Sequence, residues 1–142
     1  MSLREDLLAL RKHLTPKENW TQGCWARSHA KRRFPKEPWF VLPTDPRTDQ
    51  WCLVGGVSYV TYEVPFCWSR RSIDMFEALA DGQNINDSLV DWLIRWNDWK
   101  GRHHAEVLRR IDEAIAKLPE EEITKLPNVF PDFIKERVLE DV

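Results

Sequence analysis

Long apolar runs are missing from this sequence of 142 residues, and no stretch approaches the about 18 residues that a membrane-spanning helix needs. The first six residues, MSLRED, include two acidic residues where a secretory signal peptide would have a basic start, so we expect a cytosolic chain. Cysteine is also scarce. The three cysteines are odd in number and include no C-x-x-C pair, a pattern that is atypical of a disulfide framework or a zinc site. We expect Cys24, Cys52 and Cys67 to be free thiols.

An excess of positive charge is absent as well. The 21 lysines and arginines face 23 acidic residues, which gives a formal net charge of −2 and no overall attraction to nucleic acid or anionic lipid. The metalloprotease pattern H-E-x-x-H does not occur, and Gly55-Gly56 is a lone glycine pair without the lysine of a phosphate-binding loop. We therefore predict no cofactor, no metal and no membrane partner.

Tryptophan, in contrast, is abundant, with eight residues in a chain of single-domain length. A buried indole needs an acceptor for its N–H, and tryptophan is enriched among the residues that anchor interfaces. We expect some indoles in the core and others on a binding surface. The eight are Trp20, Trp25, Trp39, Trp51, Trp68, Trp92, Trp96 and Trp99.

Helical periodicity dominates the pattern of apolar residues and predicts a mainly α fold, a compact bundle of about five or six helices. Residues 1–118 form a single helical domain in this interpretation. Asn86 or Asp87 is the expected cap of the fourth helix, and Gly55-Gly56 favours a closely packed helix over a strand. The predicted helices cover residues 3–14, 51–61, 70–81, 86–97 and 103–118.

Two segments interrupt this pattern. Residues 19–50 are rich in proline and aromatic residues and read as a long ordered loop that contains a small β-hairpin. After Pro119, residues 131–139 begin with proline and have helical spacing. We expect residues 119–142 to be a C-terminal helical extension packed on the domain.

Three blocks carry a resemblance: WTQGCWAR at 20–27, WCLVGGV at 51–57 and WNDWKGRHHAEVL at 96–108. Their order and spacing resemble a family of small bacterial and phage-related domains of unknown function. That family reads W-x-Q-G-x-x-A-R, then C-x-x-G-A, then N-D-x-x-G-R-T-H-A-E-V. The resemblance implies a fold and transfers no activity. His103 replaces a threonine that would cap a helix, and Gly56 replaces an alanine, a change that costs about 1 kcal/mol in a helix.

The residue types of a cysteine hydrolase are present. Cys24 or Cys52 would be the nucleophile, His103 or His104 the base, and Asp98 or its neighbour Asn97 the group that orients the base. Cys52 lies in an apolar run, where burial suppresses thiolate formation, so Cys24 beside Gln22 is the better candidate. A second interpretation gives Asn97-Asp98 only a local role, in which the pair ends one helix and organises the next turn.

Aromatic and basic residues of the long loop form the candidate binding surface: Trp20, Gln22, Trp25, Arg27, Lys31, Arg32, Arg33 and Trp39. Our leading hypothesis is a non-catalytic binding domain for a protein partner, a phage-related accessory or anti-defence protein by resemblance. The alternatives are a small cysteine-dependent hydrolase or transferase, and a nucleic-acid-binding module that stacks bases on these aromatic side chains.

Overall fold

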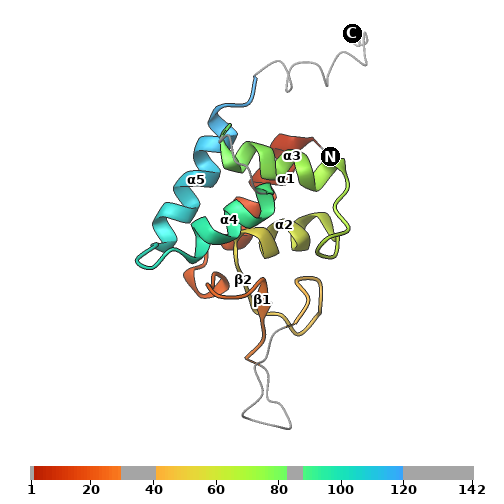
Figure 1. Cartoon of the computed structure of the whole chain (residues 1–142), viewed down its shortest axis with the longest axis vertical. Helices are drawn as coiled ribbons and strands as arrows, with labels where there is room; N and C mark the ends of the chain where they lie inside the picture. Colours follow the sequence, from red (N-terminus) through yellow and green to blue (C-terminus); the bar gives the residue numbers. More distant parts are fainter. Residues whose placement is uncertain (1, 30–40, 83–87, 120–142) are drawn as a thin grey trace, which may run out of the picture.

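The computed structural model describes residues 2–29, 41–82 and 88–119, and within these ranges the chain is mainly α-helical (Figure 1). This confirms the predicted fold class. The predicted C-terminal extension, residues 119–142, lies outside the described residues beyond Pro119. The elements are α1 (Leu3–Leu14), a short 3-10 helix (Lys17–Asn19), β1 (Ala26–Arg27), β2 (Gln50–Trp51), α2 (Leu53–Thr61), α3 (Arg70–Ala80), α4 (Leu89–Asp98) and α5 (His104–Ala116).

Serine hydroxyls begin three of these helices. Ser2 and Glu5 form a capping box, in which each side chain bonds the backbone N–H of the other residue. Ser69 caps α3 as expected. At α4 the cap is Ser88, whose hydroxyl accepts from the Asp91 N–H at 3.1 Å. The sequence prediction had placed this cap one or two residues too early.

Helix α1 lies at the centre of the bundle, where it packs against α2, α3 and α5, while α4 packs against α2 and α3. Leu7, Leu10 and Leu14 of α1 are fully buried because three neighbouring helices cover them. The other helices contribute one or more fully buried side chains each. The largest of these core residues are Leu7, Leu10, Leu14, Leu53, Val54, Val57, Met75, Phe76, Leu79, Leu93, Val107 and Ile111.

Helix α2 confirms the prediction of a closely packed helix. A Cβ atom on Gly55 would lie 1.9 Å from the carbonyl oxygen of Trp25, so only glycine permits this approach to the strand β1 region. Gly56 faces α1, where a Cβ atom would lie 2.8 Å from the end of the flexible Leu10 side chain. The two glycines therefore have different constraints.

The small sheet joins the two ends of the long loop. β1 and β2 pair antiparallel, with Ala26 opposite Trp51 and Arg27 opposite Gln50. The predicted hairpin exists, but its strands bracket the loop, and residues 30–40 lie outside the described part of the chain. The Trp51 indole is buried and donates to the Pro43 carbonyl at 2.8 Å, which ties the returning loop to the bundle.

Candidate functional site

The three sequence blocks meet at Asn97, the next-to-last residue of α4. Its side chain is fully buried. The Asn97 Oδ1 atom accepts from the Trp20 indole at 2.8 Å and from the Leu53 N–H at 3.1 Å. Its Nδ2 atom donates to the Thr21 carbonyl at 3.1 Å. The side-chain amide of Asn97 thus links α4 to the first block and to the start of α2, because its oxygen and its nitrogen both form hydrogen bonds to these segments.

Gln22 and Asp98 extend this polar cluster. The Gln22 amide donates to the carbonyls of Asn97 at 2.7 Å and Trp99 at 3.1 Å, which satisfies backbone groups left open at the end of α4. Asp98 Oδ1 accepts from the Gly23 N–H at 2.9 Å. Helix α4 ends at Asp98, as the second interpretation of Asn97-Asp98 predicts. The bonds to Gln22 and Gly23 span 75 residues, so the role of the pair is not only local and extends to the tertiary structure.

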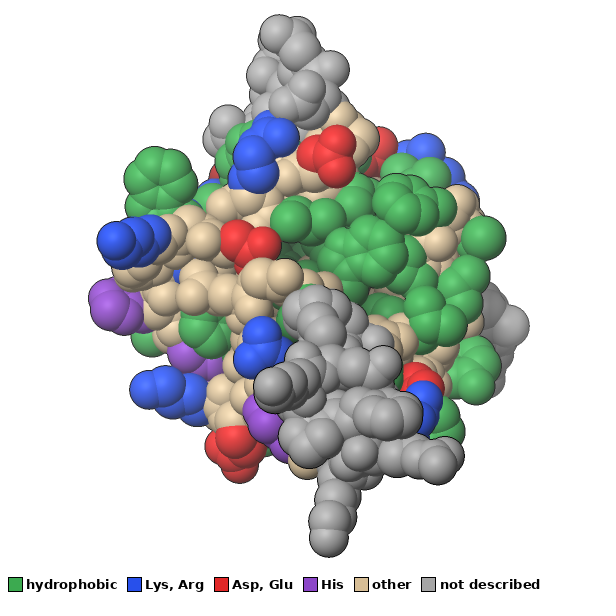
Figure 2. All heavy atoms as spheres, turned by 60° about the horizontal axis from the view of Figure 1, so that its bottom comes forward, with side chains coloured by type: hydrophobic (Ala, Val, Ile, Leu, Met, Phe, Trp, Pro, Cys, Tyr) green, Lys and Arg blue, Asp and Glu red, His purple; other side chains and the backbone are tan. Residues whose placement is uncertain are grey.

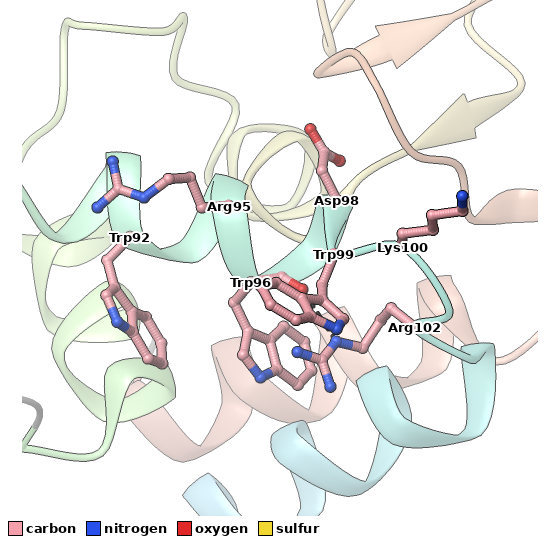
Figure 3. Close-up of a pocket in the computed structure, with 7 residues that line it drawn as sticks. All are labelled: Trp92, Arg95, Trp96, Asp98, Trp99, Lys100 and Arg102. Carbon is pink, nitrogen blue, oxygen red and sulfur yellow. Dashed lines mark hydrogen bonds between the residues drawn. The ribbon is translucent and has the colours of Figure 1, made fainter.

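A pocket of about 540 Å³ opens beside the end of α4 (Figure 3). Trp96 forms one wall, and the Arg102 guanidinium lies over its ring at 4.0 Å from the centroid. Arg110 of α5 approaches the same ring at 4.8 Å. Trp99 is 68% exposed at the rim. The lining residues are Trp92, Arg95, Trp96, Asp98, Trp99, Lys100 and Arg102.

Hydrogen bonds to backbone carbonyl groups hold the two guanidinium groups near Trp96 in place. Arg102 donates to the Trp96 carbonyl at 2.9 Å, and Arg110 donates to the Leu79 carbonyl at 2.7 Å. Burial lowers the pKa of Arg110, although an arginine stays charged at neutral pH. In Figure 3, Asp98 points away from the indoles, toward the polar cluster around Asn97. The aromatic side of the pocket is therefore basic.

A second feature lies on the loop between α2 and α3. Tyr62 and Phe66 are 78% and 77% exposed, and both have positive φ angles, +57° and +69°. Figure 2 shows hydrophobic side chains gathered on one face of the molecule. The half-buried Trp25 ring meets the Phe66 ring edge-on, with centroids 5.1 Å apart. We call Trp25, Tyr62 and Phe66 the aromatic face.

Glu63 braces the loop that carries this face. Its carboxylate accepts from the Ser69 N–H at 3.1 Å and from the Ser72 hydroxyl, which is buried in α3. The Tyr62 backbone itself ends α2, since its N–H bonds the Ser58 carbonyl. The loop is thus fixed at both ends, and the exposed rings are held outward by ordered backbone.

A family model described as a family of unknown function, DUF6197, matches residues 1–117. The chain belongs to the DUF6197 family. The match spans all three blocks that meet at Asn97, which supports the resemblance found in the sequence. No curated protein and no solved structure gives a significant match to the chain.

Three candidate catalytic residues of this DUF6197 domain lie near one another, because Asp98 and Cys24 are close enough to Cys52 to help raise the pKa of its thiol. Cys52 caps α2, where its sulfur accepts from the Gly55 N–H at 3.3 Å, and burial raises the pKa of its thiol to about 12. His104 bonds the Leu14 carbonyl at 2.7 Å. Cys24 is a half-buried free thiol. Within residues 2–29, 41–82 and 88–119, no hydrogen bond joins a cysteine sulfur to a histidine nitrogen.

His103 begins α5 in the DUF6197 domain, although histidine is a poor cap. The Glu106 carboxylate accepts from the His103 N–H at 2.8 Å, and this bond lowers the pKa of Glu106. Asp98 does not compensate for the missing threonine, because it bonds Gly23. Glu106 therefore keeps one half of the capping box that the family pattern predicts.

The predicted binding residues have mixed positions. Trp20 is half-buried with its N–H on Asn97, and Arg27 donates to the Gln22 carbonyl at 3.3 Å. Trp25 contributes to the aromatic face, and Trp20 lines a separate pocket of about 470 Å³ together with His103 and His104. The other predicted binding residues lie outside the described residues: Lys31, Arg32, Arg33 and Trp39.

The sequence interpretation missed Trp99, Tyr62 and Phe66. Trp99 follows Asn97-Asp98 at the end of a predicted helix, and a position after a helix end indicates an exposed side chain. Tyr62 and Phe66 flank Val64-Pro65 after an apolar helix, and proline near aromatic residues signals an exposed turn.

Two further findings concern metals and membranes. The described residues contain no group of three or more histidine, cysteine or acidic side chains placed to hold a metal ion. None of the helices in the same ranges is both long and apolar enough to cross a bilayer.

Proposed function

We propose that this DUF6197 domain is a non-catalytic binding module that recognises a protein partner through its aromatic face. The observation that carries the proposal is the conformation of Tyr62 and Phe66. Each ring is more than three-quarters exposed. The positive φ angle of Tyr62 belongs to the C-cap of α2, whereas Phe66 lies in the loop between α2 and α3 and has a positive φ angle of +69° without capping a helix. For a residue other than glycine, such backbone costs on the order of 1–3 kcal/mol, and such strain is concentrated at functional sites.

The chemistry of the face favours a protein over a nucleic acid. Residues 59–66 contain a single charged side chain, Glu63, and it is negative. A nucleic-acid surface needs cations to neutralise phosphates. Rigid aromatic rings that stand out from a braced loop instead match the anchors found at the centres of protein interfaces. We expect the partner to present an apolar pocket or groove.

The thiols support a cytosolic setting for this function. Cys67 is exposed and unpaired, and all three cysteines are free. Exposed free thiols are typical of a reducing compartment, because disulfides form readily outside it. Counting the thiols of the chain isolated from its host without reductant tests this part of the proposal, and fewer than three would contradict it.

The binding proposal is tested with matched variants. The full chain is used to isolate partners from its host, and the identified partner is then titrated against the purified chain and against Phe66→Ala and Leu8→Ala. Leu8 is 49% exposed on α1 and serves as the control. Loss of an anchor costs about 2 kcal/mol, so Phe66→Ala should weaken binding about 30-fold. Equal affinity of all three chains, with unchanged circular dichroism, would contradict the proposal.

A further inference from the structure

A pocket between the short 3-10 helix and the first turn of α5 is lined mostly by basic side chains. Its volume is about 470 Å³. Figure 1 places the start of α5 on one side of the bundle and the α2–α3 loop on the other, so this pocket is separate from the aromatic face. We call it the histidine pocket. Its lining residues are Lys17, Trp20, Arg102, His103, His104 and Ala105.

The charge of the histidine pocket favours an anion. Among the described residues, no carboxylate belongs to its lining. Arg102 is already engaged, since it donates to the Trp96 carbonyl at 2.9 Å and lies 3.6 Å from an oxygen of Glu106. Lys17 is exposed, and in the described part of the chain no carboxylate bonds its ammonium group. The groups that remain for an anion are therefore this ammonium and the two imidazoles.

Helix capping does not account for the imidazole of His103. Histidine is a poor residue for the start of a helix. The hydrogen bond that closes the start of α5 comes from the Glu106 carboxylate, which accepts from the His103 N–H at 2.8 Å. The His103 side chain itself is exposed and lines the pocket. Contact with a ligand gives this imidazole a role that the backbone does not.

A hydrogen bond fixes the tautomer of His104. Its Nε2 atom lies 2.7 Å from the Leu14 carbonyl oxygen, and Nε2 carries the proton because a carbonyl oxygen can only accept. The nitrogen left for a ligand is Nδ1. In the neutral ring Nδ1 is an acceptor, so it bonds an anion only with an added proton, which either the ring or the anion carries.

The histidine pocket has more room than an inorganic anion needs. At about 30 Å³ for each water molecule, its 470 Å³ correspond to about 16 waters. Trp20 provides the apolar part of the lining, because its indole N–H is bonded to Asn97 at 2.8 Å and leaves the ring carbons to meet a ligand. A planar ring attached to the anion fits beside this indole.

We infer that the histidine pocket binds a phosphate monoester carried on a planar ring, the chemical class of the nucleoside monophosphates. Lys17, His103 and His104 offer three nitrogen donors for the three terminal oxygens of such a phosphate, whereas a carboxylate has only two oxygens. The ring of the ligand packs against Trp20. Binding at neutral pH takes up a proton, because His104 Nδ1 needs one to bond the phosphate. The site does not involve the aromatic face, so either proposal can fail without the other.

Calorimetric titration of the full chain tests the site. The probes are adenosine monophosphate, uridine monophosphate and phenyl phosphate, and we expect at least one of them to bind with a dissociation constant below about 1 mM. Adenosine lacks the anion and inorganic phosphate lacks the ring. Each should therefore bind at least about tenfold more weakly than the ester.

Matched variants locate the bound phosphate. Lys17→Gln and His103→Thr should each weaken binding about tenfold, since each removes a charge-assisted hydrogen bond. Threonine is a better helix cap than histidine, so His103→Thr leaves the fold intact. Lys12→Gln removes an exposed lysine of α1 outside the lining and is the control, with unchanged affinity.

Proton uptake gives a second readout. The charged groups that line the pocket with His104 are Lys17, Arg102 and His103, and α1 contributes the Leu14 carbonyl. Heats of binding measured at about pH 7.5 in buffers of different ionisation enthalpy give the number of protons taken up. His104→Gln keeps a donor for the Leu14 carbonyl but cannot take a proton, so it should reduce this number.

Failure of all three esters to bind below about 1 mM would overturn the inference. Adenosine or inorganic phosphate that binds as tightly as the ester would contradict a site that holds both the anion and the ring. Binding that Lys17→Gln and His103→Thr leave unchanged would place the phosphate elsewhere on the chain. Equal proton uptake by His104→Gln and the unmodified chain would contradict the contact of the phosphate with His104.

Discussion

The Trp20 indole donates a hydrogen bond of 2.8 Å to the Asn97 side chain, across 77 residues of sequence. The same Asn97 oxygen accepts the first free N–H of α2, from Leu53. The Asn97 side chain thus provides the hydrogen-bond acceptor for two donors, the partly buried indole N–H of Trp20 and the backbone N–H of Leu53 at the start of α2. Three motif blocks of the family therefore converge on one structural centre.

Replacing Asn97 with alanine is expected to destabilise the fold by about 3 kcal/mol. The variant leaves the Trp20 indole and the Leu53 N–H without their acceptor, and each buried unpaired group costs about 1–3 kcal/mol. Urea denaturation followed by circular dichroism measures the loss. Glu18→Gln, at an exposed position, is the control, and a loss below about 1 kcal/mol for Asn97→Ala would contradict the central role of this amide.

The two glycines of α2 should respond differently to alanine. Gly55→Ala forces a Cβ against the Trp25 carbonyl, which is backbone and cannot yield, so we expect a loss of about 3 kcal/mol or failure to fold. Gly56→Ala meets the end of the Leu10 side chain and gains up to about 1 kcal/mol of helix propensity. Thermal melts of both variants, compared with that of the unmodified chain, measure the change in stability. An equal loss for both would show that α2 does not approach β1 as described.

His13 should make the fold sensitive to acid. Its ring stacks on Tyr59 at 4.0 Å and meets Trp51 at 4.1 Å, and burial lowers its pKa from 6.5 to about 4. Between these values the unfolded chain binds the proton and the folded chain does not. The contribution of the neutral His13 ring to the free energy of unfolding is therefore complete above pH 6.5 and is lost as the pH falls toward 4.

Urea midpoints measured across this pH range test the His13 prediction. His13→Gln should flatten the pH dependence between pH 6.5 and about 5, where few carboxylates titrate. The control is Leu8→Ala, at an exposed position of α1 without a titratable group, which should keep the slope of the unmodified chain. If His13→Gln also keeps that slope, the ring is not the group that senses acid.

Thiol labelling distinguishes the binding module from a cysteine enzyme. At about pH 8 iodoacetamide should modify the exposed Cys67 first, because only an accessible thiolate reacts. Cys52 should react only after denaturation, since burial raises its pKa to about 12. Mass spectrometry of the labelled peptides gives the order. Rapid labelling of Cys24 or Cys52 in the folded chain would favour the hydrolase alternative.

Local patterns in the sequence determined the helices. The spacing of Leu7, Leu10 and Leu14 predicts α1 with its observed bounds, and Ser69 is correctly identified as the cap of α3. These features were predictable because helix periodicity and capping involve residues only three or four positions apart. The close packing of α2 was also predictable, since Gly55-Gly56 has few other uses in an apolar helix.

Only the tertiary structure decided what the polar and aromatic residues do. Asn97 bonds partners 44 and 77 residues away, and no local pattern encodes these distances. Trp92 and Trp96 match a core stripe in the sequence, yet both are half-buried beside Arg110 of α5, because α5 packs on α1 and α3. Long-range contacts fix which face of a helix meets another helix. The face of the helix that packs against its neighbours decides whether an indole is buried or exposed, and local sequence patterns do not specify that face.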